Sequence, residues 1–400
     1  AAGMVGDGVP LVDGGSGAKA YGQAVGVYLT FLISKTADRN SSICSWDASR
    51  EGIRNTFGRQ AIPMVWDFPK TNILENSGNC WLNALDRIAI SIKVVLSTIS
   101  KKQKAQQFDA SKFYASGNNF IVSTDPPYYN NIGYSDLSDF FYVWLRRSLG
   151  HIYPDLFGTV LVPKMEELVA SDFRYGSKEA AKLHFEEGFK KTFKNLISSL
   201  DSRFPLTVYY AFKQDEDIDG NEDPDNNSIS LTTGWETMLE GLVSAGFQIN
   251  ATWPIKASQS LRVLARETNA LTSYIVLACR PRSLSAASIT RREYLQVLKM
   301  ELPTAIKLLQ NSNLAPVDLA QATIGPGMSI FSRYEKILEQ DGTSMPVRTA
   351  LSLINKSLAE ILAEQEGDFD AETRWALSWF EQNEFESGTF GDANALALAK

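Results

Sequence analysis

Residues 120–129, FIVSTDPPYY, decide how the rest of the chain is interpreted. A short apolar run with β-branched residues is followed by a proline pair, and proline cannot continue a central ladder. The segment therefore predicts a buried strand that ends in a loop. Strands and helices alternate in the residues that follow, which favours an α/β sheet. The further strands are expected at 206–212, 247–255 and 273–281, and the helices at 135–149, 177–201 and 235–246.

The chain on both sides of this sheet is expected to be mainly helical. Residues 18–36 carry apolar residues at helical spacing and predict a buried helix. From about residue 290 the pattern is helical again and indicates a separate cap or bundle, with a break at IGPG, 324–327. We expect three domains, which are a mainly helical part at 1–105, an α/β core at 106–285 and a helical region with an acidic tail at 286–400.

The composition is typical of a soluble globular protein, with 44% hydrophobic and 21% charged residues. No apolar run reaches the roughly 18 residues that a membrane span needs, and the N-terminus has no secretory pattern. The three cysteines form no CxxC pair and only two histidines occur, which argues against a zinc site. We expect a cytoplasmic protein with reduced thiols and no metal.

The net charge of −7 hides an uneven distribution. Residues 360–400 hold ten acidic and two basic side chains, so the rest of the chain is close to neutral. Overall acidity therefore does not exclude a nucleic-acid partner. Lysines between residues 178 and 194 alternate with glutamates, which indicates a solvated face rather than a phosphate-binding one. The polar cluster RNTFGRQ at 54–60 favours a buried network over contacts with DNA.

The tetrapeptide Asp125, Pro126, Pro127 and Tyr128 stands at the carboxyl end of the expected strand. Ligands of open α/β sheets bind at that edge. The Asp125 carboxylate and the Pro126 carbonyl could accept the N–H groups of an exocyclic amine and stabilise the positive charge that grows there during methyl transfer. Proline fixes φ and so aims that carbonyl, and Tyr128 offers a flat face to an extruded base. The alternative is an ordinary strand end, with a Pro-Pro turn and an aspartate cap.

Long segments around this motif closely resemble a family of adenine-specific DNA methyltransferases that carry an N-terminal DUF1156 region. The resemblance covers nearly the whole chain. It rests on DPPYYNNIGYSDLSDFFYVWLRRSL (125–149), PDLFGTVLVPKMEELVA (154–170), RNTFGRQAIPMVWDF (54–68), VYYAFKQ (208–214), TGWETMLEGLVSAGF (233–247), TNALTSYIVLACRPR (268–282) and APVDLAQATIGPGMSIFSRYEKILE (315–339).

The resemblance implies a class I, Rossmann-like fold and transfer of a methyl group from S-adenosyl-L-methionine (AdoMet) to N6 of an adenine flipped out of DNA. It places the catalytic residues at 125–128. Asp109 matches a position where such enzymes often carry an acid near the adenine of AdoMet, and it is the candidate cofactor residue. Relatives typically have aspartate where this chain has Asn130.

The chain departs from the family's pattern at the cofactor loop. Relatives carry a D-P-F-x-G-G-G-like segment upstream of the matched region, and this chain has none. The sheet is therefore expected to be incomplete, with the missing N-terminal half of the same protein as a partner. VPLVDGGSGAKAYG at 9–22 is a candidate substitute, with a strand, a glycine turn and a helix, although a connector is favoured.

Two other functions stay open at this point. A fragment without its own AdoMet site would act as a DNA-binding or partner module. A complete enzyme could also methylate an amine of RNA or protein, because sites of this type serve several planar amines.

Overall fold

The chain forms a mixed α/β structure, as the sequence predicts, and it divides into two compact units. The N-terminal unit comprises Ala1–Asp109 and Asn131–Glu167, and the sheet unit comprises Ala110–Asn130 and Leu168–Lys400. The computed structural model describes residues 3–58, 62, 64–75, 80–98, 105–112, 120–129, 132–211, 233–256, 273–310, 316–366, 371–383, 385, 387–388 and 390–399.

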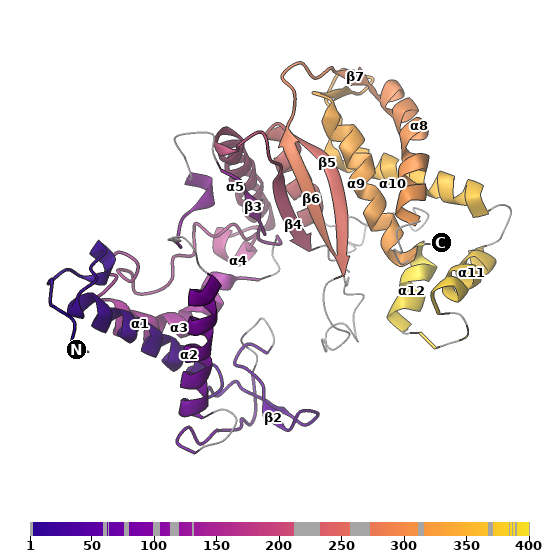
Figure 1. Ribbon diagram of the computed structural model, residues 1–400. Helices are drawn as coiled ribbons and strands as arrows, with labels where there is room; N and C mark the ends of the chain where they lie inside the picture. The colour runs from indigo at the N-terminus through magenta and orange to yellow at the C-terminus, as the bar shows by residue number, and fades with distance from the viewer. Residues whose placement is uncertain are drawn as a thin grey trace. The chain divides into compact units, whose positions relative to one another are not determined.

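These units cut across the expected domain ranges, because α3 (Tyr134–Leu149) packs on α1 (Ala18–Ala37). Residues 131–167 therefore belong with the N-terminal helices, although they lie inside the range expected for the α/β core. The other described elements of this unit are the 3₁₀ turn η1 (Leu11–Asp13), α2 (Trp81–Thr98) and the hairpin of β1 (Trp46–Asp47) and β2 (Gly52–Ile53) (Figure 1).

The helix expected at 18–36 is confirmed as α1, but the expectation that it is buried is wrong. Only Ala20, Thr30 and Leu32 are buried, and large apolar side chains such as Tyr28 and Phe31 are exposed. The helix carries apolar side chains on all of its faces, whereas α2 and α3 cover only part of it. The buried cluster of this unit is small and consists of Tyr142, Leu149, Ile152 and Phe157.

The sheet unit is built on four strands in the order β3-β4-β6-β5. β3 (Ser123–Thr124) pairs in parallel with β4 (Leu206–Ala211), with Ser123 opposite Thr207. β6 (Ser273–Pro281) runs antiparallel to both β4 and β5 (Phe247–Lys256), so it lies between them. All three later strands fall where the sequence predicts them, whereas the strand at 120–129 is only two residues long.

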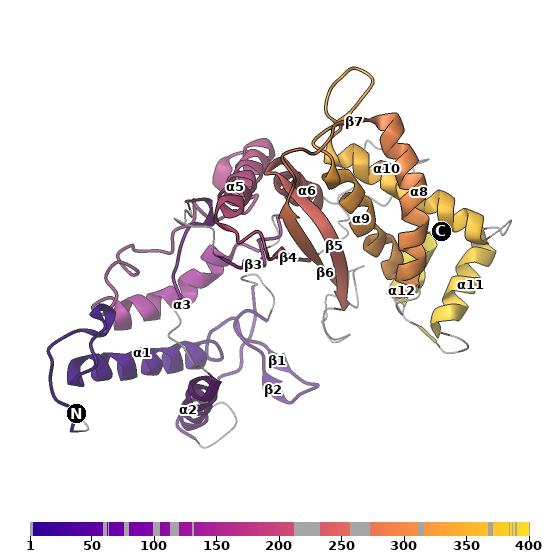
Figure 2. The same cartoon turned by 45° about the horizontal axis from the view of Figure 1, so that its top comes forward.

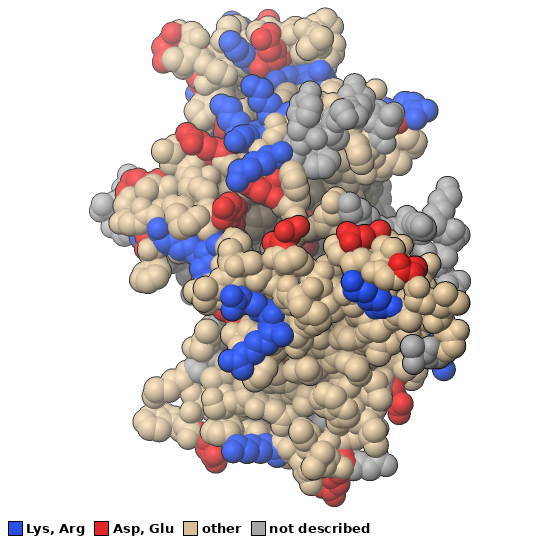
Figure 3. Space-filling model, turned by 90° about the vertical axis from the view of Figure 1, so that its left-hand side faces the viewer, with Lys and Arg blue, Asp and Glu red and all other residues tan. Residues whose placement is uncertain are grey.

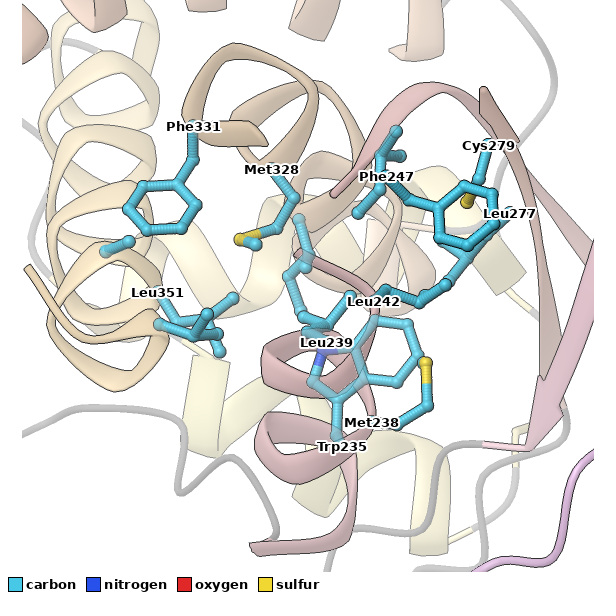
Figure 4. Packing of buried hydrophobic residues seen from close by; sticks show 14 of the residues in the cluster. Trp235, Met238, Leu239, Leu242, Phe247, Leu277, Cys279, Met328, Phe331 and Leu351 are labelled. Carbon is cyan, nitrogen blue, oxygen red and sulfur yellow. The ribbon is translucent and has the colours of Figure 1, made fainter. Parts of the chain in front are cut away.

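The core of this unit lies where helices meet the sheet. In Figure 4, Trp235 and Leu239 of α6 (Thr233–Ser244) lie between Phe247 of β5 and Leu351 of α10 (Val347–Glu366). α5 adds Phe185, Phe189 and Phe193, one turn apart on a single face. The remaining elements are η2 (Ala110–Lys112), α4 (Asp172–Tyr175), α5 (Lys178–Ser199), β7 (Ile289–Thr290), α8 (Arg291–Gln310), α9 (Pro316–Arg333), β8 (Ile337–Leu338), α11 (Ala371–Asn383) and α12 (Phe390–Ala399).

Helices α8, α9 and α10 share the core of the sheet, so the expected separate cap is wrong for this part of the region. Figures 1 and 2 both show α9 beside β5, the edge strand of the sheet. The buried Ser332 hydroxyl at the end of α9 accepts a hydrogen bond from the Ile249 backbone N–H at 2.9 Å. This bond satisfies a donor on the outer edge of β5, next to the bulge between Ile249 and Ala251.

The IGPG segment at 324–327, expected to be a break, lies inside α9. Its glycines serve close packing instead of a turn. A Cβ atom on Gly325 would lie 1.7 Å from Oγ1 of Thr252 on β5, and one on Gly327 would lie 2.5 Å from a side-chain carbon of Ile354 on α10. The missing side chains therefore let α9 approach both neighbours closely.

We predict that Gly325→Ala destabilises the sheet unit by about 1–3 kcal/mol, because overpacking forces α9 away from β5. Urea unfolding followed by tryptophan fluorescence measures the change. The matched control is Gly22→Ala in α1, where an added Cβ meets no atom within 4 Å. That variant should keep or raise stability by up to about 1 kcal/mol. Equal stability of Gly325→Ala and the unaltered protein would contradict the packing described for α9.

Candidate functional site

The tetrapeptide lies directly after β3, at the carboxyl end of the parallel pair β3–β4. The Thr207 N–H donates to the Val122 carbonyl at 3.1 Å and extends this pairing by one bond. The Asp125 side chain is exposed, and Pro126 and Pro127 are half-buried. A carboxylate is thus held at the edge of the sheet where ligands of α/β proteins bind.

Tyr128 makes a polar contact with Asp125 and an aromatic contact with Tyr210. Its hydroxyl donates a hydrogen bond to Oδ1 of Asp125 at 2.5 Å. Its ring meets the ring of Tyr210 edge to face, with centroids 5.2 Å apart. Tyr210 is buried in β4, and its own ring lies 5.5 Å from that of buried Trp235 on α6. The exposed Asp125 is therefore joined through the half-buried Tyr128 to an aromatic column that continues into the core.

Tyr129 links the tetrapeptide to a second part of the core. Its φ of 51° is left-handed, a conformation that is costly for a residue with a large side chain. The Tyr129 ring contacts Phe185 of α5 edge to face at 5.2 Å, and its carbonyl accepts a hydrogen bond from the Ala170 N–H at 3.1 Å. Burial, and secondarily Glu186, raises the pKa of the Tyr129 phenol. Such strain is typical of functional segments when the surrounding structure holds it in place.

Gly234, at the start of α6, makes close contact with these tyrosines. A Cβ atom on Gly234 would lie 2.7 Å from Cβ of Tyr129 and 3.2 Å from the Tyr210 hydroxyl oxygen. Only glycine lets α6 come this near to the strained segment. Sequence reasoning assigned no role to Gly234, Tyr210 or Trp235, and the only signal was that VYYAF and TGW lie within the segments that resemble the family.

The candidate cofactor residues belong to the N-terminal unit, and the tetrapeptide belongs to the sheet unit. Asp109 is half-buried and belongs to the N-terminal unit, so it remains a candidate on the resemblance alone. In the segment 9–22 the expected strand is the 3₁₀ turn η1 instead. The Asp7 carboxylate accepts hydrogen bonds from the backbone N–H groups of Ser16 and Gly17 at 3.2 and 2.9 Å. The Val9 N–H also donates to this carboxylate. The hydrogen bonds from Ser16 and Val9 are the largest causes that lower the pKa of Asp7.

The amide groups of this glycine turn thus already hold a carboxylate from the same chain. Backbone N–H groups at a helix start can bind a ligand only if they face it. Segment 9–22 therefore does not fit a loop that cradles AdoMet.

Other polar residues singled out in the sequence are engaged at the surface. Arg54 and Asn55 are exposed, and they donate hydrogen bonds to Asp47 and Asp38 respectively. Their expected burial is wrong, and Arg59, Gln60 and Asn130 lie outside the described residues. The five lysines of α5 are exposed, as expected for a solvated face. On the face drawn in Figure 3, Lys and Arg side chains alternate with Asp and Glu.

The helix expected at 135–149 is confirmed as α3, which begins at Tyr134. Gly133 occupies the N-cap position, and the Glu167 carboxylate accepts hydrogen bonds from both the backbone N–H and the hydroxyl of Ser135. A carboxylate remote in sequence therefore satisfies the first turn of this helix. Of its aromatic residues only Tyr142 is buried.

Among the described residues, no group of three or more His, Cys, Asp or Glu side chains is arranged to hold a metal ion. None of the described helices combines the length and apolarity of a membrane span. His184 stacks on Tyr175 with ring centroids 4.3 Å apart.

We predict that Gly234→Ala displaces the tyrosines of the site, because the new methyl group would collide with Cβ of Tyr129. The expected result is a loss of about 1–3 kcal/mol of stability and an altered near-ultraviolet circular dichroism spectrum. Gly241→Ala in the same helix is the matched control, since its Cβ would make ordinary contacts of 3.4–3.7 Å. An unchanged spectrum for Gly234→Ala would contradict the close approach of α6 to the site.

Comparison with known protein families gives a match at the end of the chain. A family model described as a domain of unknown function (DUF8807) matches residues 370–400. No curated protein and no solved structure matches the chain.

Proposed function

We propose that this chain is the amine-binding, catalytic part of an AdoMet-dependent methyltransferase that acts on N6 of adenine in DNA. The observation that carries the proposal is the exposed Asp125 carboxylate at the carboxyl end of a parallel strand, hydrogen-bonded to the Tyr128 hydroxyl. A buried or turn-capping aspartate would have argued for the ordinary strand end. The family resemblance supplies the substrate.

In this proposal, the chain makes the exocyclic amine of adenine, a poor nucleophile, react with the methyl donor. The lone pair of the adenine amine is delocalised into the ring, and acceptors at its N–H groups favour the pyramidal, cationic form that develops during transfer. Asp125 would accept one N–H and the Pro126 carbonyl the other. The Tyr128 hydroxyl is hydrogen-bonded to Asp125, so the Tyr128 ring would stack on the same base that the Asp125 carboxylate holds.

The sheet order supports a class I methyltransferase fold. Such sheets are mostly parallel, with one antiparallel strand inserted near the C-terminal edge. Here β3 and β4 are parallel, and the hairpin of β5 and β6 inserts antiparallel β6 beside β4. Four strands correspond to part of such a sheet, with β3 at its edge.

AdoMet would supply the methyl group, but the glycine turn of segment 9–22 does not fit the loop that would hold it. The Asp7 carboxylate already accepts hydrogen bonds from the amides of that turn. We therefore propose that AdoMet binding needs the N-terminal half that relatives carry upstream. The same observation favours the second candidate, in which this chain alone is a DNA-binding or partner module.

We predict that Asp125→Ala lowers methyl transfer by about a hundredfold or more, which is typical when a group that stabilises transition-state charge is lost. The measurement, made on the chain together with an upstream half that binds AdoMet, is transfer of tritiated methyl from AdoMet to DNA, RNA and protein in separate reactions. Asp172→Ala, which removes an exposed carboxylate from α4, is the matched control and should keep full activity. Transfer to RNA or protein but not to DNA would reject the proposed substrate.

Calorimetric titration with AdoMet separates the two candidates. We expect no binding by the present chain and binding after addition of an upstream half that contains a glycine-rich loop. Binding that needs no upstream half would show that our account of the cofactor is wrong. An AdoMet-saturated protein that transfers no methyl group to any substrate would overturn the enzyme proposal.

A further inference from the structure

The side chain of Phe173 in α4 is 95% exposed, the largest exposed fraction of any aromatic side chain in the described part of the protein. An exposed ring adds nothing to the core, so folding does not explain it. Single apolar residues at a surface are common. The position of Phe173, and not its exposure alone, is therefore what needs an explanation.

The backbone that carries Phe173 is held on both sides. Before it, the buried Ala170 donates its N–H to the Tyr129 carbonyl at 3.1 Å. After it, Tyr175 stacks on His184 of α5, and Gly176 ends the helix with a φ of 81°. Phe173 thus projects into solvent from a fixed turn, between two anchored residues.

This turn adjoins the candidate site within the sheet unit. Ala170 is bonded to Tyr129, the residue directly after the tetrapeptide. Phe173 is three positions after Ala170, so their Cα atoms lie at most about 11 Å apart. Phe173 is therefore an exposed apolar side chain on a segment that is hydrogen-bonded to Tyr129, the residue next to Tyr128.

A base that leaves a duplex breaks its pairing and stacking, and this costs a few kcal/mol. Proteins that distort DNA offset such costs with an apolar side chain, often Phe, Leu, Ile or Met, placed between base steps. We propose that Phe173 is such a wedge and fills the gap that the extruded adenine leaves in the helix. This inference rests on the proposed function, and it makes Phe173 a positioning residue rather than a catalytic one.

The test compares binding of the full chain to two fluorescently labelled duplex pools of mixed sequence. One pool is fully paired, and the other carries adenines opposite abasic sites, where the base leaves its stack without a wedge. Phe173→Ala should bind the paired pool about tenfold more weakly and the abasic pool within about twofold of the unaltered protein, since aromatic stacking on a base has this magnitude. Phe173→Leu should restore paired binding, because leucine also serves as a wedge.

Phe385→Ala is the matched control, because that ring is 94% exposed on the segment between α11 and α12. It should bind both pools like the unaltered protein, and neither variant should change the thermal midpoint. If Phe173→Ala binds both pools normally, the wedge is wrong while the proposed function stands. If the unaltered chain binds neither pool, DNA as substrate fails and the wedge fails with it. An equal loss on both pools would mean that Phe173 is a general DNA contact and not a wedge.

Discussion

The parallel pairing of residues 122–124 with β4 is the constraint on which the candidate site depends. The strand is short, yet it brings the tetrapeptide to the carboxyl end of β4, where Tyr210 is buried. Without that pairing, Asp125 would be one more aspartate in a proline-rich loop. With it, a carboxylate at the surface is joined through Tyr128 and Tyr210 to Trp235 in the core.

The close-packed core holds the side chains of the exposed candidate site in place. Protein interiors are close-packed, so side chains that rest on them keep a defined orientation. Two aromatic contacts anchor the segment, one from Tyr128 to Tyr210 and one from Tyr129 to Phe185. The left-handed φ of Tyr129 persists because α5 and the close approach of Gly234 leave the segment little freedom. The strain is thus offset by packing on both sides of the sheet edge.

The proposed reaction needs one site for the amine and its base and another for AdoMet, and only the first has candidate residues that lie together in this chain. The groups that would hold an amine and a planar base lie together in the sheet unit, and the short helix with Phe173 adjoins them. The glycine-rich segment near the start of the chain instead directs its amides at Asp7. This asymmetry is the reason for our proposal that AdoMet binding needs an upstream half.

Local sequence signals were sufficient for most elements and for the tetrapeptide. Apolar periodicity located β4, β5, β6 and the helices around them, because side-chain spacing reflects the repeat of each element. The same signals placed Asp125 at a strand end. They did not reveal the packing role of Gly325 inside α9, the capping of α3 by Glu167, or the aromatic support from Tyr210 and Trp235. Each of these depends on a neighbour far away in the chain, which only the tertiary structure decides, because long-range contacts leave no periodic pattern in the sequence.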